Sequence, residues 1–147
     1  MNIENVEKAK YSELIIIWEA SVRATHDFLQ EEDIKFLKPL ILEQYFDAVD
    51  LKCVKDSSGK ILGFSGISDG NIEMLFISPE SRGKGVGAAL CKHVINNSNV
   101  VKVDVNEQNP QAIGFYEHMG FKVIGRSPLD GQGKPFPLLH MELGENK

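Results

Sequence analysis

The residues best suited to chemistry lie in one short segment, residues 82–88, which reads R-G-K-G-V-G-A. Its alternating glycines, Gly83, Gly85 and Gly87, let the backbone approach a ligand where any Cβ would collide. Arg82 and Lys84 add two positive charges. Apolar residues recur at helical spacing directly afterwards, so the amide N–H groups of a helix start would face the same ligand. The segment therefore predicts a binding site for a phosphate ester.

Two nucleotide-binding motifs can be compared with this segment. The loop of nucleoside triphosphatases requires G-x-x-x-x-G-K-(S/T), which these glycines do not satisfy, so we exclude it. The dinucleotide fingerprint G-x-G-x-x-(G/A) is formally met by Gly83, Gly85 and Ala88, with Asp104 as the downstream ribose-binding acid. That match is weak, because residues 78–82 separate the glycines from the preceding apolar run and about half of the chain comes before them.

A third motif uses Arg82 directly. Residues 82–87 meet the pattern (Q/R)-x-x-G-x-(G/A), and residues 109–121 meet N-x-x-A-x-x-(F/L)-Y-x-x-x-G-F. Two such motifs in this order resemble the GNAT superfamily of N-acetyltransferases. The resemblance spans essentially the whole chain, and the words T-H-D-F-L, V-N-E-Q-N and G-K-P-F-P-L-L are similar to the small bacterial YjaB-type members.

The resemblance implies a fold and a cosubstrate. We expect one domain over residues 1–147, of mixed α/β class, with a mostly antiparallel, splayed central sheet and about four helices. We expect acetyl-CoA as the acetyl donor, with its pantetheine arm entering the splayed gap. The residues that the resemblance places on acetyl-CoA are Phe76, Ile77, Arg82, Gly83, Lys84, Gly85, Val86, Gly87, Ala88, Asn109, Ala112 and Phe115.

The resemblance also implies a general acid and suggests a base. It places the acid, which protonates the departing CoA thiolate, at Tyr116. Glu73 lies on the strand that leads to the glycine loop and could take a proton from an acceptor amine, directly or through water. The alternatives are that Tyr116 is a packed core aromatic residue and that Glu73 is a solvated strand residue.

Two residues are expected near the acceptor. His26 falls between the first two predicted helices, a region that borders the acceptor pocket in the family, and Asn71 could hold a water or the substrate. A capping or packing role for His26 is an equal alternative. The Gly- and Pro-rich segment 126–137 is predicted to be a long loop over the acceptor side, with Arg126, Asp130 and Lys134 as specificity groups.

Cysteine and metal chemistry are not expected. Cys91 could form an acyl intermediate, but its helical spacing from neighbouring apolar residues favours a buried position and direct transfer. His93, His118 and His140 show no ligand spacing with other metal-binding residues, so we predict no metal.

Composition limits the function classes. The chain has 147 residues, 42% of them hydrophobic, which suits one domain with a sizeable core. Its net charge of -5 argues against a nucleic-acid partner and weakly favours a cationic acceptor. Without a signal-like segment or a transmembrane-length run, we expect a cytoplasmic protein with no membrane partner. It could be a monomer or a homodimer.

The expected reaction is acetyl transfer to a primary amine, either a small molecule or a protein lysine. A non-catalytic acyl-CoA-binding or sensor domain and, third, a dinucleotide-dependent oxidoreductase stay as alternatives.

The elements that must position these residues follow from periodicity and turn signals. We expect a helix over Ser12–Arg23 capped by Ser12, a second over Ile34–Phe46 despite Pro39, a third after the glycine loop, and a fourth from Asn109 or Pro110 to Met119, closed by Gly120. The predicted strands are Leu51–Val54, Ile61–Ile67, Ile72–Ile77, Val100–Val105, Phe121–Ile124 and Leu138–Leu143.

Overall fold

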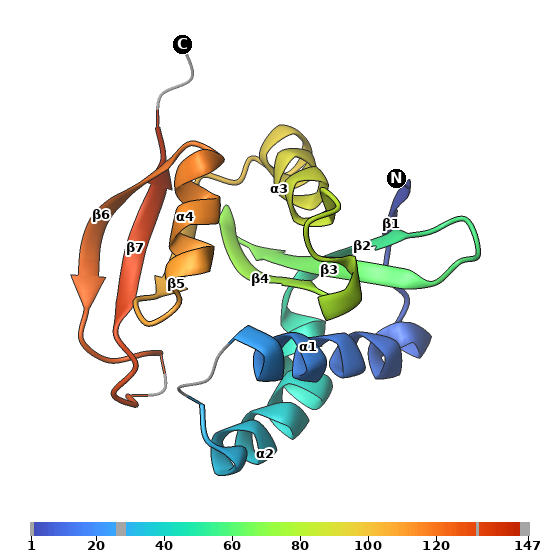
Figure 1. The fold of residues 1–147 in the computed structure, drawn as a ribbon, viewed down its shortest axis with the longest axis horizontal. Coiled ribbons are helices and arrows are strands. Elements are labelled where there is room, and N and C mark those ends of the chain that lie inside the picture. The colour runs from blue at the N-terminus through green and yellow to red at the C-terminus, as the bar shows by residue number, and fades with distance from the viewer. Residues whose placement is uncertain (1, 26–28, 132, 145–147) are drawn as a thin grey trace.

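The chain forms one seven-stranded sheet with helices on both faces (Figure 1). The computed structural model describes residues 2–25, 29–131 and 133–144. The strands are β1 (Asn2–Asn5), β2 (Asp50–Lys55), β3 (Ile61–Ser68), β4 (Asn71–Ile77), β5 (Lys102–Asn106), β6 (Phe121–Ser127) and β7 (Leu138–Leu143). The α-helices are α1 (Tyr11–Thr25), α2 (Glu31–Leu40), α3 (Val86–Asn97) and α4 (Pro110–His118).

The sheet is divided at its centre. Its strand order is β1-β2-β3-β4-β5-β7-β6, and every neighbouring pair is antiparallel except β4 and β5. These two parallel strands pair only at Asn71 with Lys102 and Ile72 with Val103, and then separate. The predicted mixed, mostly antiparallel and splayed sheet is confirmed.

Apolar side chains fill both faces of the sheet. On one face, α1 and α2 cover β2, β3 and β4 through a core that includes Leu14, Trp18, Phe46 and Phe64. On the other face, α3 packs on the first half of the sheet and α4 on the second half (Figure 1). On this second face one core cluster joins α3 and the first half of the sheet to α4 and the second half, so packing continues across the division between β4 and β5.

The ends of α4 are set by local chemistry, as predicted. The Asn109 side chain caps the helix by accepting a hydrogen bond from the Ala112 amide at 3.2 Å, and Pro110 takes the first helical position. Gly120 follows the helix with φ of +106°, a conformation that glycine adopts readily.

The N-terminal part differs most from the prediction. Ser12 is not the cap of α1, because a short 3₁₀ turn at Lys8–Lys10 leads directly into a helix that begins at Tyr11. The strand β1, which pairs with β2, was not predicted, since four residues are too few to show a clear alternation.

The second helix begins earlier than predicted. It begins at Glu31, because Gln30 and Asp33 form a reciprocal capping box. Pro39 lies inside the helix without ending it, and the chain continues as a π-helical turn at Ile41–Tyr45 and a 3₁₀ turn at Phe46–Ala48. Proline has no amide hydrogen, so α2 lacks one of its backbone hydrogen bonds at Pro39.

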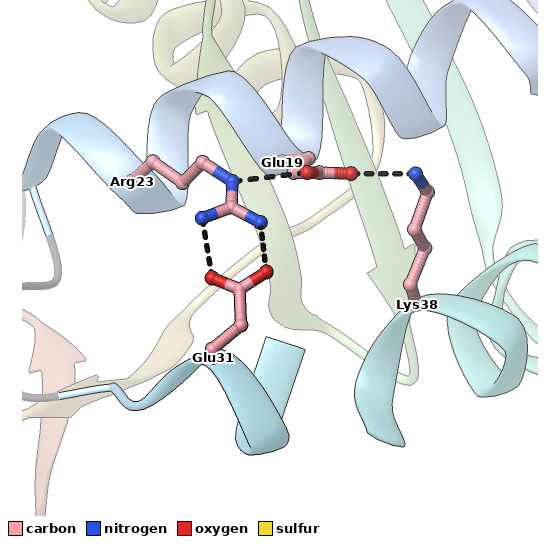
Figure 2. A network of polar contacts seen from close by, with 4 residues as sticks. All are labelled: Glu19, Arg23, Glu31 and Lys38. Atoms are coloured by element: carbon pink, nitrogen blue, oxygen red, sulfur yellow. Dashed lines mark hydrogen bonds and ion pairs between the residues drawn. The ribbon is translucent and has the colours of Figure 1, made fainter. Parts of the chain in front are cut away.

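Charged side chains connect α1 to α2 on the outside (Figure 2). Arg23 donates two hydrogen bonds of 2.8 Å to Glu31, and its Nε donates to Glu19 at 2.9 Å. Lys38 lies 2.6 Å from the other oxygen of Glu19. Hydrogen bonds from Lys38 and then Arg23 lower the pKa of Glu19, and a hydrogen bond from Arg23 lowers that of Glu31. The two helices on this face of the sheet, α1 and α2, are thus held together by ion pairs as well as by their shared apolar core.

Within the described ranges, no helix is both long and apolar enough to cross a membrane.

Candidate active site

A cleft of about 740 Å³ opens where β4 and β5 separate. Its walls come from β4 after its first residue, the loop that leads to α3, most of β5 and one side of α4. Two side chains at the end of α1, Ser21 and Thr25, also reach it. The division of the sheet therefore produces a cavity rather than a tightly packed seam.

The glycine loop forms one end of the cleft. Gly83 and Gly85 both have left-handed φ values, +77° and +82°, and Gly85 immediately precedes the first residue of α3. The first bond of the helix runs from the Ala89 amide to the Gly85 carbonyl, so the amides of residues 86–88 have no partner within the helix. Backbone N–H groups and the positive helix end suit a diphosphate.

The loop is not attached to the strand as in a dinucleotide fingerprint. A 3₁₀ turn at Pro79–Ser81 separates β4 from the first glycine. A Cβ added at Gly87 would make ordinary van der Waals contact, 3.5 Å from the Phe115 ring and 3.7 Å from Ile77. The start of α3, Phe115 of α4 and the end of β4 therefore lie close together at this end of the cleft.

The two cations of the motif are placed differently. The Arg82 guanidinium donates a 2.7 Å hydrogen bond to Gln111 on α4, and both residues line the mouth of the cleft. Lys84 is exposed on the loop and is not among the lining residues. Arg82 is therefore positioned against the same space as the helix amides, while Lys84 contributes charge from outside.

One wall of the cleft is the free edge of β4. On its other side β4 pairs with β3, including Phe64 with Phe76 and Gly63 with Ile77. In the part of the chain that the structure describes, residues 73–77 have no backbone pairing with β5. An extended ligand arm can therefore pair with β4 at this edge, as the family resemblance implies for Phe76 and Ile77.

The opposite wall presents the aromatic residues of α4. Asn109, Ala112, Phe115 and Tyr116 all line the cleft. The Tyr116 ring is held edge-on between Phe115 and Phe121, with centroids 5.1 and 5.6 Å away, and only 7% of the residue is exposed. Burial, and secondarily the neighbouring Cys91, raises the pKa of Tyr116 well above its ordinary value. The phenol therefore stays protonated at neutral pH, as a proton donor must.

Glu73 occupies an irregular position on β4. Gly66 pairs with Met74 and Ile67 pairs with Ile72, so Glu73 is the extra residue of a β-bulge. In a regular strand, Ile72 and Met74 would point to the same face of the sheet. Because of the bulge they point to opposite faces: Ile72 packs in the core beneath α4, whereas Met74 packs in the core beneath α1. Glu73 itself projects into the cleft.

The surroundings of Glu73 favour its use as a base. The residue is exposed overall, yet partial loss of solvent around its carboxyl group, followed by the charges of Asp104 and Asp69, raises its pKa. A carboxylate with a raised pKa holds a proton more strongly, which suits proton removal from an amine. The cleft thus presents a phenol on one wall and a carboxylate on the other.

Asn71, which was predicted to contact the substrate, is not brought to the cleft. Asn71 lies at the start of β4, pairs with Lys102, and is not a lining residue. His26 lies outside the described residues. Cys91 is fully buried in α3, and burial raises the pKa of its thiol to about 12, so it is not suited to act as an acyl-carrying nucleophile.

The predicted loop of residues 126–137 begins later than expected, because Arg126 and Ser127 belong to β6. Arg126 forms an ion pair with Glu107, the residue that follows β5. Lys134 reaches α2, where its Nζ lies 3.5 Å from Asp33 and 4.5 Å from the centre of the Phe36 ring. Lys134 thus connects this segment to α2, and both cations, Arg126 and Lys134, are engaged by protein groups.

The described part of the chain contains no group of three or more side chains that could hold a metal.

Sequence reasoning assigned no role at this site to several lining residues. Asp104 lines the cleft beside Glu73, and the alternating pattern of its strand was the signal that could have placed it there. Other lining residues without a predicted role include Ser21, Thr25, Gln111 and His118.

Known proteins are similar to this chain in sequence and in fold. The sequence model of the acetyltransferase (GNAT) domain matches residues 18–143. The peptidyl-lysine N-acetyltransferases YjaB of Salmonella typhimurium and Escherichia coli are 40% and 42% identical. These matches cover 93% and 88% of this chain and 96% and 87% of theirs.

A comparison with solved structures also identifies a YjaB protein as similar. The solution structure of apo-form YjaB from Escherichia coli superposes with a TM-score of 0.86 at 39% identity, covering 96% of this chain and 95% of that one. The resemblance stated from the two sequence motifs is therefore confirmed, including its YjaB-type character. The chain belongs to the GNAT superfamily of N-acetyltransferases.

Proposed function

We propose that this chain transfers the acetyl group of acetyl-CoA directly to the side-chain amine of a protein lysine. The observation that carries the proposal is the cleft itself, in which Tyr116 and Glu73 face a common space next to the glycine loop. The names of the YjaB relatives, peptidyl-lysine N-acetyltransferases, support lysine as the acceptor. A cationic acceptor also suits the acidic groups at the Glu73 end.

Acetyl-CoA would be held along the cleft by groups already described. The diphosphate would lie on the amides of residues 86–88 with Arg82 beside it, and the pantetheine arm would pair with the free edge of β4 at Phe76 and Ile77. Asn109, Ala112 and Phe115 would border the arm from α4. This placement directs the thioester toward the end of the cleft that holds Glu73 and Tyr116.

The acetyl transfer requires Glu73 to accept a proton and Tyr116 to donate one. Glu73 takes one proton from the acceptor ammonium, and the neutral nitrogen attacks the thioester carbonyl carbon. As the C–N bond forms and the C–S bond breaks, Tyr116 gives its proton to the departing sulfur. The newly bonded nitrogen then loses its second proton, directly or through water, to the tyrosinate, and solvent removes the proton on Glu73. Transfer is direct, since the buried Cys91 thiol is not available to carry the acetyl group.

The setting is proposed to be the cytoplasm, without nucleic-acid or membrane partners and without a metal. Both cysteines, Cys53 and Cys91, are free and buried, which suits a reducing compartment.

Mass spectrometry tests the acceptor. Purified protein is incubated with acetyl-CoA and a peptide whose N-terminus is blocked and whose only amine is one lysine side chain. We expect one acetyl group on that lysine and one equivalent of free CoA, and no product from the same peptide with arginine in place of lysine. Acetylation of a small amine but not of the peptide would contradict the lysine assignment. CoA binding without any transfer would support the non-catalytic alternative.

A further inference from the structure

Three side chains from adjacent strands form a continuous hydrogen-bonded chain behind the cleft. The Nε2 atom of His140 on β7 lies 2.6 Å from the hydroxyl of Ser127 on β6. Its Nδ1 atom lies 2.6 Å from a carboxylate oxygen of Asp104 on β5. Asp104 and His140 are direct cross-strand partners, so the sheet itself fixes this contact. The three strands follow one another as β6, β7 and β5 from the edge of the sheet to its central gap (Figure 1), so the hydrogen bonds connect the edge with that gap.

The hydrogen-bond partners of His140 determine which ring nitrogen carries a proton. An ionised carboxylate only accepts hydrogen bonds, so Nδ1 of His140 carries a proton and donates it to Asp104. In the neutral imidazole, Nε2 then accepts from the Ser127 hydroxyl. Both ring nitrogens are therefore engaged, and the ring orientation is fixed from both sides.

The position of the cleft relative to these three side chains distinguishes the arrangement from a catalytic serine with a histidine base. Ser127 and His140 are not among the residues that line the cleft, whereas Asp104 is. The serine thus lies away from the reaction space, and the carboxylate is the end of the chain that a ligand can reach. We conclude that Ser127 and His140 act on Asp104 rather than through an activated hydroxyl.

Asp104 is placed beside the candidate base. β4 and β5 are last paired at Ile72 and Val103, so the next residues, Glu73 and Asp104, come where the two strands separate. Both side chains line the cleft, and the charge of Asp104 acts on the Glu73 carboxyl group. Two carboxylates therefore line the acceptor end of the cleft: Glu73 on the bulge, and Asp104, which is hydrogen-bonded to His140.

We propose that Asp104 contacts the acceptor amine together with Glu73, and that His140 is the positioning residue that holds Asp104 for this contact. This inference rests on the proposed function and specifies its substrate class: a primary amine that enters as the ammonium cation. Glu73 removes one proton from that cation, while Asp104 accepts a hydrogen bond from it. A carboxylate fixed in advance loses little conformational freedom when the acceptor binds.

Asp104→Asn is the first test, because the amide keeps the size of the side chain and an oxygen that can accept from His140. With the lysine peptide as acceptor, we expect the KM for the peptide to rise about tenfold, since a hydrogen bond to a charged group is weakened. The affinity for CoA should not change. The acidic limb of the kcat/KM profile should move to lower pH, because the loss of a neighbouring negative charge lowers the pKa of Glu73.

Other charged groups near this position stay in place in that variant. Asp69 remains in the turn before β4, and His118 remains on the α4 side of the cleft. Lys102 and Glu142 remain two cross-strand pairs away on β5 and β7. A movement of the limb can therefore be assigned to Asp104.

His140 tests the positioning role. His140→Phe removes the donor to Asp104 and should raise the peptide KM in the same direction but by less, whereas His140→Asn places an amide N–H near the Nδ1 position and should restore it. His93→Phe on the surface of α3 is the matched control and should leave KM unchanged. CoA-induced thermal stabilisation of each variant verifies that it is folded.

The two proposals fail differently. If the wild type acetylates the peptide but Asp104→Asn leaves both the peptide KM and the acidic limb unchanged, the role of Asp104 is contradicted and the proposed function stands. If His140→Phe and His140→Asn behave alike, the positioning role is contradicted. If the wild type transfers no acetyl group to any amine, the proposed function fails and this inference fails with it.

Discussion

The two ends of the cleft are built in different ways. The proposed cofactor end comes from one contiguous segment, residues 82–88, together with the helix that follows it directly. The proposed acceptor end is assembled from residues far apart in the chain: Glu73 on β4, Asp104 on β5, and His140 and Ser127 behind them. The geometry of the first end is local, whereas that of the second depends on strand register and a bulge.

This difference separates two kinds of effect. A change in the glycine loop should alter binding of the donor, whatever the acceptor is. A change at the acceptor end should alter the rate, its pH dependence or the acceptor KM, and leave donor affinity intact. The following variants test that separation.

The largest expected effect is at Gly85. In Gly85→Leu, a side chain would enter the space expected for the diphosphate, and we expect stabilisation by CoA to be lost. The left-handed φ of +82° adds a folding cost of about 1–2 kcal/mol for a residue with a Cβ. Gly59→Leu is the control, because Gly59 has φ of +88° in a hairpin turn with open space around it. Retained CoA binding in Gly85→Leu would mean that the diphosphate lies elsewhere.

The next effect is at Tyr116. Tyr116→Phe removes the proton donor but keeps the ring packed against Phe115 and Phe121, so we expect kcat to fall about a thousandfold while CoA affinity is kept. Stopped-flow or steady-state release of CoA measures the rate. Tyr11→Phe, which loses only a hydrogen bond to Asp47, should retain the wild-type rate. An unchanged rate in Tyr116→Phe would exclude this residue as the acid.

A smaller loss is expected for Glu73→Gln. On the order of one lysine in a thousand is uncharged at neutral pH, so removing the base should lower kcat/KM about a hundredfold. The wild-type rate should fall as pH drops through the raised pKa of Glu73, because the carboxyl group becomes protonated, and the variant should lack that limb.

Asp69→Asn provides the comparison for Glu73. It removes one of the charges that raise the Glu73 pKa, so the limb should move to lower pH without a large loss of rate. A limb that persists unchanged in Glu73→Gln would assign the base to another group.

The smallest effect is expected at the ion-pair network between α1 and α2 (Figure 2). Arg23→Gln removes the contacts to Glu19 and Glu31, which loosens the side of the acceptor end formed by the end of α1. We expect a slight rise in the peptide KM and no change in CoA affinity, since exposed ion pairs contribute little. A large loss of CoA affinity would contradict the separation of the two ends.

The same division explains what the sequence could predict. The loop and α4 were predicted because glycine spacing, Asn109, Pro110 and Gly120 determine their geometry locally. The bulge at Glu73 was not, because a bulge exists only relative to the partner strand.

Long-range pairing explains the remaining gap. Asp104, His140 and Ser127 belong to three strands, and no sequence spacing relates them until β7 is inserted between β5 and β6. His140 had been considered only as a metal ligand, for which it showed no spacing.

The most direct test of the central claim, that the cleft between β4 and β5 binds acetyl-CoA, is a thermal-shift titration with acetyl-CoA, CoA and NADH in parallel. A ligand at about 100 times its dissociation constant adds about 2.7 kcal/mol of stability. For a chain of this size, that corresponds to a rise of several degrees in Tm. We predict stabilisation by both CoA species and none by NADH. Stabilisation by NADH alone would contradict the account.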